Sequence, residues 1–161
     1  MLEDTLLGFR LEAWARSPRA RLVAHPRFYL FDTGVTNALA RRLTAVPEPV
    51  SRGRLFEEWV VAECFRLVDY RLGETRLYYW RTNHGAEVDL LFERHGRLRL
   101  AAEIKAKRQV VGADIEGLRS FADAHAGVPR VVVSLAPEPY RLEGIEVLPY
   151  RRFFDRLEER L

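Results

Sequence analysis

Two carboxylates and a lysine are predicted to meet on the polar face of two adjacent strands. Glu103 and Lys105 lie two residues apart in a strand expected over Arg97–Lys105, and alternation places both on the same side. A hairpin through Glu93–Gly96 then brings Asp89 of the preceding strand close to Glu103. Two carboxylates held together repel each other unless a cation lies between them. Such oxygen ligands suit Mg²⁺ or Mn²⁺, and a neighbouring lysine can orient a water molecule or stabilise charge on a phosphate.

The rarity of lysine draws attention to the same strand. The chain has 26 basic residues, and only Lys105 and Lys107 are lysines. Arginine holds its charge permanently and spreads it over a planar group, whereas lysine carries a compact charge and can lose its proton. The composition therefore favours a chemical role for Lys105. Lys107 has no comparable explanation and is grouped with Arg97 and Arg99, which share the predicted polar face, as a candidate contact to nucleic-acid phosphates.

A long helix, which Ser51 can cap and which is expected to run to about residue 70, supplies further carboxylates. Glu57 falls on its apolar side, and Glu63 is enclosed by large apolar neighbours. Because a carboxylate directed inward is costly unless it is paired or bound to a metal, either residue is a candidate third acid of the site. A nearby arginine is the alternative partner for Glu63. Glu87 shares the predicted face of the strand acids, where it either completes the ligand shell or forms a salt bridge.

The elements that must position these residues follow from apolar periodicity and turn residues. After the long helix, the expected order is three strands, a helix, two strands and a helix, at 75–81, 86–92, 97–105, 114–124, 130–135, 145–148 and 150–161. A proline-rich turn is expected before the strand at 145–148. Alternation predicts two sets of side chains that face the core together, namely Val88, Leu90 and Phe92 on one strand and Leu98, Leu100, Ala102 and Ile104 on the next.

Residues 1–50 and 51–161 differ in pattern. The first part holds two short apolar stretches, Leu6–Trp14 and Arg27–Phe31, separated by an arginine-rich segment, then a turn and a short helix. It is too small to have a full core of its own. We therefore expect an N-terminal extension at 1–50 that packs on a core domain at 51–161, and a winged-helix remnant is an alternative interpretation of the extension.

Composition limits the classes of protein that need considering. A chain of 161 residues makes one domain, and a net charge of +3 permits a polyanionic partner without requiring one. A single cysteine, Cys64, excludes an intrachain disulfide and any multi-cysteine metal site. No apolar run approaches 18 residues, and acidic residues near the N-terminus are unlike a signal peptide. These features predict a cytoplasmic protein that does not span a membrane.

The order of these motifs resembles the PD-(D/E)XK nuclease superfamily. Within the superfamily, the chain is more similar to the C-terminal domain attached to prokaryotic AAA-type P-loop ATPases. Five short sequence motifs between about residues 25 and 150 carry this resemblance: Phe28–Gly34, Gly53–Glu57, Tyr79–Arg81, Gly85–Asp89 and Glu103–Lys105. The resemblance implies an α/β fold with a restriction-endonuclease-like αβββαβ core, a mixed sheet flanked by helices. Two departures are that Val88 stands where the superfamily has proline, and that this chain has no Gly-rich phosphate loop.

The resemblance also implies an activity and a set of roles. Asp89 and Glu103 would hold Mg²⁺ or Mn²⁺, Glu57 rather than Glu63 would be the helix acid, and Lys105 would position the attacking water. The implied function is a metal-dependent DNA endonuclease, and a homodimer would suit double-strand cutting. The alternative is a catalytically inactive DNA-binding or docking module that works with an AAA-type ATPase partner or a missing ATPase domain.

Overall fold

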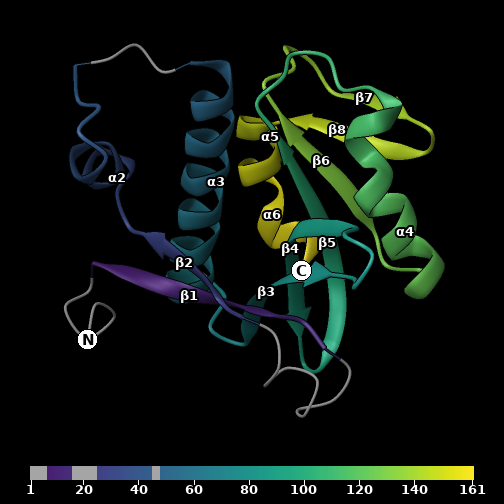
Figure 1. Cartoon of the computed structure of the whole chain (residues 1–161). Helices are drawn as coiled ribbons and strands as arrows, with labels where there is room; N and C mark the ends of the chain where they lie inside the picture. The colour runs from purple at the N-terminus through teal and green to yellow at the C-terminus, as the bar shows by residue number, and fades with distance from the viewer. Residues whose placement is uncertain (1–6, 16–24, 45–47) are drawn as a thin grey trace.

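The computed structural model describes residues 7–15, 25–44 and 48–161. Its centre is one eight-stranded mixed sheet in the order β2-β1-β3-β4-β5-β6-β8-β7 (Figure 1). Strands β3 (Thr75–Arg81), β4 (Glu87–Arg94) and β5 (Arg97–Lys105) form an antiparallel meander, and β6 (Arg130–Ser134) and β8 (Ile145–Pro149) continue the sheet in parallel. The chain therefore has an α/β fold, as predicted.

Shorter strands complete the two edges of the sheet. At one edge, β1 (Gly8–Ala13) pairs antiparallel with β2 (Arg27–Leu30) and reaches β3 in parallel through two residue pairs. The described part of the N-terminal extension thus continues the same sheet. A short helix, α2 (Thr33–Leu39), follows β2. At the other edge, β7 (Tyr140–Leu142) pairs antiparallel with β8.

Helices cover both faces of the sheet (Figure 1). The long helix α3 (Pro49–Arg71) packs on one face with α5 (Tyr150–Asp155) and α6 (Leu157–Arg160), and α4 (Glu116–Ala124), entered through the short 3₁₀ turn η1 (Gly112–Ile115), packs on the other. Each face has its own buried apolar cluster, so the central strands are shielded from water on both sides. The order helix, three strands, helix, strand expected from the sequence is present.

Three boundaries differ from the sequence prediction. Helix α3 begins at Pro49 rather than at Ser51, because proline lacks an amide hydrogen and suits the first helical turn. The single final helix expected over 150–161 is two helices, since Arg156 between them has a non-helical φ of −111°. The strand β7 lies in a segment expected to be a proline-rich turn, and its three residues are too few to show a period.

Two shifts of register overturn part of the predicted alternation. One lies between β3 and β4, and beside it Val88 joins the apolar cluster under α4 while Leu90 and Phe92 pack under α3. The other lies between β4 and β5, where Leu98 packs toward α4 while Leu100 packs toward α3. An extra residue in one strand reverses the face that the next side chains occupy, so strict alternation placed Val88 and Leu98 wrongly.

Part of the N-terminal prediction lies outside the described residues, namely Leu6 of the first apolar stretch, the acidic N-terminus and the arginine-rich segment at 16–21. The division at residue 50 and the winged-helix interpretation stay predictions. Within the described ranges, no helix is both long and apolar enough to cross a membrane.

The first turn of α4 approaches the start of β4 very closely. A Cβ atom added to Gly117 would overlap the main-chain oxygen of Glu87, and it would lie 3.6 Å from Oε2 of Glu103. Only glycine allows the helix to come this near to the strand. The helix is thereby brought against the region of the sheet that carries the predicted acids.

We expect Gly117→Ala to destabilise the fold by about 1–3 kcal/mol, because the added methyl group forces the helix off the strand. The matched control is Gly53→Ala in α3, where an added Cβ meets nothing within 4 Å. This control should gain up to about 1 kcal/mol, since alanine favours a helix over glycine. Denaturant unfolding measures both. Equal stability of Gly117→Ala and the wild type would show that the close approach is absent.

Candidate functional site

A pocket of about 750 Å³ opens where the start of β4 and the end of β5 meet α3 and α4. The turn between β3 and β4 lines one side, and the first turns of α4 line another. Its walls bring together the residues predicted as the site core and one predicted supporting acid, namely Glu57, Glu87, Asp89, Glu103 and Lys105. The structure therefore gathers side chains that lie as much as 48 residues apart in the sequence.

Asp89 is held by the neighbouring strand. Only 7% of the residue is exposed, and Oδ2 accepts a hydrogen bond of 2.8 Å from the main-chain amide of Ile104. That amide lies between Glu103 and Lys105 in β5. The bond therefore ties the position of the Asp89 carboxylate to the strand that carries the other two predicted residues.

Glu103 has one satisfied and one unsatisfied carboxylate oxygen. The residue is 6% exposed, and its Oε1 lies 2.6 Å from Nζ of Lys105. Within the described part of the chain, the buried Oε2 has no hydrogen-bond partner. A buried carboxylate oxygen without a partner carries a large desolvation cost, so the site has a position at which a cation would be strongly favoured.

The electrostatics of the pair follow from burial and mutual repulsion. Burial raises the pKa of Asp89 well above that of an ordinary aspartate, and the charges of Glu103 and Glu57 raise it further. Burial also raises the pKa of Glu103, while Lys105 opposes that rise. Burial alone would lower the pKa of Lys105, but its acidic neighbours, Glu103 first, outweigh burial and raise the pKa. Lys105 is therefore a charged hydrogen-bond donor at neutral pH.

The outer wall of the pocket is organised by two residues that the sequence analysis gave no role. The guanidinium of Arg27 bonds Glu87 and lies 3.7 Å from Oε1 of Glu57, and the hydroxyl of Tyr29 donates to the same Glu57 oxygen at 3.1 Å. Arg27 also lies 4.5 Å from the ring centre of Tyr79. Side chains of strand β2 thus hold both Glu57 and Glu87, which we call the outer acids. Tyr29 falls within the stretch Phe28–Gly34 that carried the family resemblance, and Arg27 directly precedes it.

Other predicted residues lie away from the pocket. Glu63 pairs with Arg66, an arginine of the kind that the sequence analysis named as its alternative partner. Arg99 donates through Nε to the main-chain oxygen of Leu161 at 3.1 Å, on the sheet face that carries α6. Arg97 is exposed at the opposite end of β5 from Glu103.

Lys107 pairs with Asp114, whose other oxygen accepts a hydrogen bond of 3.0 Å from the Val111 amide. The pair closes the loop that leads into η1. Lys107 therefore has a structural explanation, which the sequence analysis lacked. Its proposed contact to nucleic acid stays a prediction.

The donor set fits a hard divalent cation in part. Two buried carboxylates, one with an oxygen that lacks a partner, are the ligand type that Mg²⁺ and Mn²⁺ prefer, with water in the remaining positions. Across the described residues, however, no three acids, histidines or cysteines are grouped closely enough to hold a metal ion. Glu57, the predicted third acid, is paired instead with Arg27 and Tyr29.

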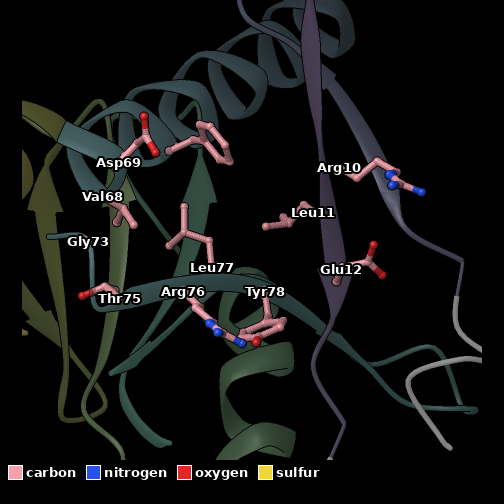
Figure 2. Close-up of a pocket in the computed structure, with 11 residues that line it drawn as sticks. Arg10, Leu11, Glu12, Val68, Asp69, Gly73, Thr75, Arg76, Leu77 and Tyr78 are labelled. Carbon is pink, nitrogen blue, oxygen red and sulfur yellow. The ribbon is translucent and has the colours of Figure 1, made fainter. Parts of the chain in front are cut away.

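A second hollow, of about 320 Å³, lies where β1 separates from β3 over the last turns of α3 (Figure 2). Figure 2 shows the side chains of Leu11 and Leu77 turned toward the space between the strands, while Arg10, Glu12 and Arg76 turn away from it. Its lining is therefore largely apolar, and its two acids, Glu12 and Asp69, come from separate elements. Of the two pockets, only the acid-lined one has groups suited to phosphate chemistry.

The α/β fold and the acid-lined pocket define a single-sheet domain with a candidate catalytic site. The chain belongs to a family described as a domain of unknown function (DUF4143), whose sequence profile matches residues 52–153. Two curated relatives are each 33% identical to this chain over 99 residues, namely the uncharacterized proteins Rv2008c of Mycobacterium tuberculosis and Mb2031c of Mycobacterium bovis. The aligned region covers 60% of this chain and 21% of each relative. The chain thus spans about a fifth of the relatives' length. No solved structure matches this chain.

We expect Asp89→Asn to stabilise the protein at neutral pH without divalent cations, by about 1–2 kcal/mol. The amide keeps an oxygen for the Ile104 bond but removes a buried charge beside Glu103. Because the folded-state pKa of Asp89 is raised, the carboxylate penalises folding only where it is ionised. The gain should therefore shrink as the pH falls toward about 4, the pKa of an unfolded aspartate.

The matched control is Asp114→Asn. Burial would raise the pKa of Asp114, but hydrogen bonds from Lys107 and the Val111 amide outweigh it and lower that pKa. This substitution should therefore destabilise the protein. Thermal unfolding of both variants across pH 4–8 tests the prediction, and a loss of stability in Asp89→Asn at neutral pH would contradict it.

Proposed function

We propose that this domain is a metal-dependent DNA endonuclease of the PD-(D/E)XK type. The observation that carries the proposal is the buried pair of Asp89 and Glu103, with an oxygen that lacks a partner, beside Lys105. The element order helix, three strands, helix, strand supports a restriction-endonuclease-like core. Three of the five stretches that resemble the superfamily contribute residues to the walls of the pocket, namely Gly53–Glu57, Gly85–Asp89 and Glu103–Lys105.

The residues divide the work of phosphodiester hydrolysis. Asp89 and Glu103 would hold Mg²⁺ or Mn²⁺, with Glu57 reaching the cation directly or through water. The bound cation would supply Lewis-acid activation of the scissile phosphate. Lys105, as a charged donor in contact with Glu103, would orient the attacking water and stabilise negative charge that develops on the phosphate. The buried floor of the pocket keeps these groups in fixed positions.

The proposal extends to the setting of the domain. DNA is the proposed substrate, and pairing of two copies would allow cleavage of both strands. The resemblance to domains that follow AAA-type ATPases makes such an ATPase the proposed partner. A second candidate function, a docking or DNA-binding module without catalysis, is favoured by one observation: three acids are not gathered into a ready metal site within the described residues.

Cleavage assays on supercoiled, linear and branched DNA, with Mg²⁺, Mn²⁺ or EDTA, test the proposal. We expect metal-dependent nicking that falls about 100-fold or more in Glu103→Gln and Lys105→Ala, because each removes a group that contacts the reacting centre. Arg71→Ala is the matched control. It removes an exposed cation that pairs with Glu158 at the end of α3, many turns along the helix from Glu57, so it should retain most of the activity.

Two results would contradict the assignment. Cleavage that survives both Glu103→Gln and Lys105→Ala would place the active site elsewhere. Absence of cleavage on every substrate, together with absence of metal binding, would favour the docking module. Circular dichroism of each variant separates a loss of chemistry from a loss of folding.

A further inference from the structure

Arg27 is a cation that the chain itself brings to the edge of the acid site. It comes from β2, which is the edge strand of the sheet. Its guanidinium nevertheless bonds Glu87 and lies 3.7 Å from Glu57. A quarter of its side chain is exposed, compared with 63% for Arg81, the other arginine near Glu87. Charge interactions of the more buried group are screened less by water and salt.

The charges around the pocket do not balance. Five carboxylates line the pocket; those of Glu57, Glu87, Asp89 and Glu103 are enclosed at least in part, whereas Glu116 is exposed and is left out of the balance. Two enclosed cations, Arg27 and Lys105, contact them. With all six groups ionised the set carries two negative charges, which is the charge that one divalent cation neutralises. Without Arg27 the set would carry three, and Glu57 would lose its positive partner.

We propose that Arg27 is an internal counter-ion that competes with the divalent cation for the outer acids Glu57 and Glu87 and thereby limits the site to one metal ion. This inference rests on the proposed metal-binding function and adds a positioning residue to it. Arg27 and Tyr29, both from β2, hold the same oxygen of Glu57, an acid that shares the pocket with Asp89 and Glu103. Strand β2 therefore sets the affinity and the number of the metal ions that the site takes.

Calorimetric titration of the full chain with Mn²⁺ tests this proposal without any cleavage assay. The wild type should bind one Mn²⁺ ion. Arg27→Gln should bind Mn²⁺ with a Kd about tenfold lower, or take a second ion, because an extra negative charge faces the site. Arg27→Lys keeps the charge and should resemble the wild type, which separates charge from packing over Tyr79.

Arg81→Gln is the matched control, since it also removes a positive charge near Glu87, at 3.7 Å, but from an exposed position. Its Mn²⁺ binding should stay within about twofold of the wild type. Equal binding by Arg27→Gln and the wild type would overturn the counter-ion proposal alone. Weaker binding by both Arg27→Gln and Arg27→Lys would also overturn it, by showing that Arg27 only supports the local structure. Absence of Mn²⁺ binding in every protein would overturn the proposed function as well.

Discussion

The burial of two carboxylates side by side is the constraint on which the site depends. Asp89 and Glu103 lie in the middle of a sheet that is covered on both faces, where an ionised carboxylate is costly. The fold compensates this cost only in part, through the Ile104 amide and the ammonium group of Lys105. One oxygen of Glu103 is left without a partner among the described residues. A cation bound between the two carboxylates, as we propose, would remove this cost.

The rest of the architecture brings supporting groups to that pair. The absence of a side chain at Gly117 lets α4 approach the start of β4 and the carboxylate of Glu103. Helix α3 brings Glu57 from one face of the sheet. The edge strand β2 supplies Arg27 and Tyr29, whose side chains contact Glu57. Local geometry therefore couples three parts of the chain to one pocket. Strands β2 and β1, which carry this contribution, belong to the same sheet as the strands of the acid pair.

Much of this arrangement could be predicted from the sequence, because it depends on short-range periodicity. The apolar alternation of β5 places Glu103 and Lys105 together, and the hairpin after β4 places Asp89 beside them. Periodicity could not reveal the register shifts that moved Val88 and Leu98 to the other face, since one extra residue leaves no mark on composition. It also could not reveal Arg27, whose role depends on a contact between strands 60 residues apart. Long-range pairings of this kind are decided by tertiary packing rather than by local pattern.

The most direct test of the central claim is anomalous scattering from crystals of this chain grown near neutral pH with Mn²⁺. We predict one manganese peak in contact with the carboxylates of Asp89 and Glu103, with Oε2 of Glu103 among its ligands. A well-ordered pocket with no manganese peak between those two carboxylates, at saturating Mn²⁺, would contradict it. In that case the buried pair would be a structural feature that tolerates its own repulsion, and the proposed chemistry would have no metal to support it.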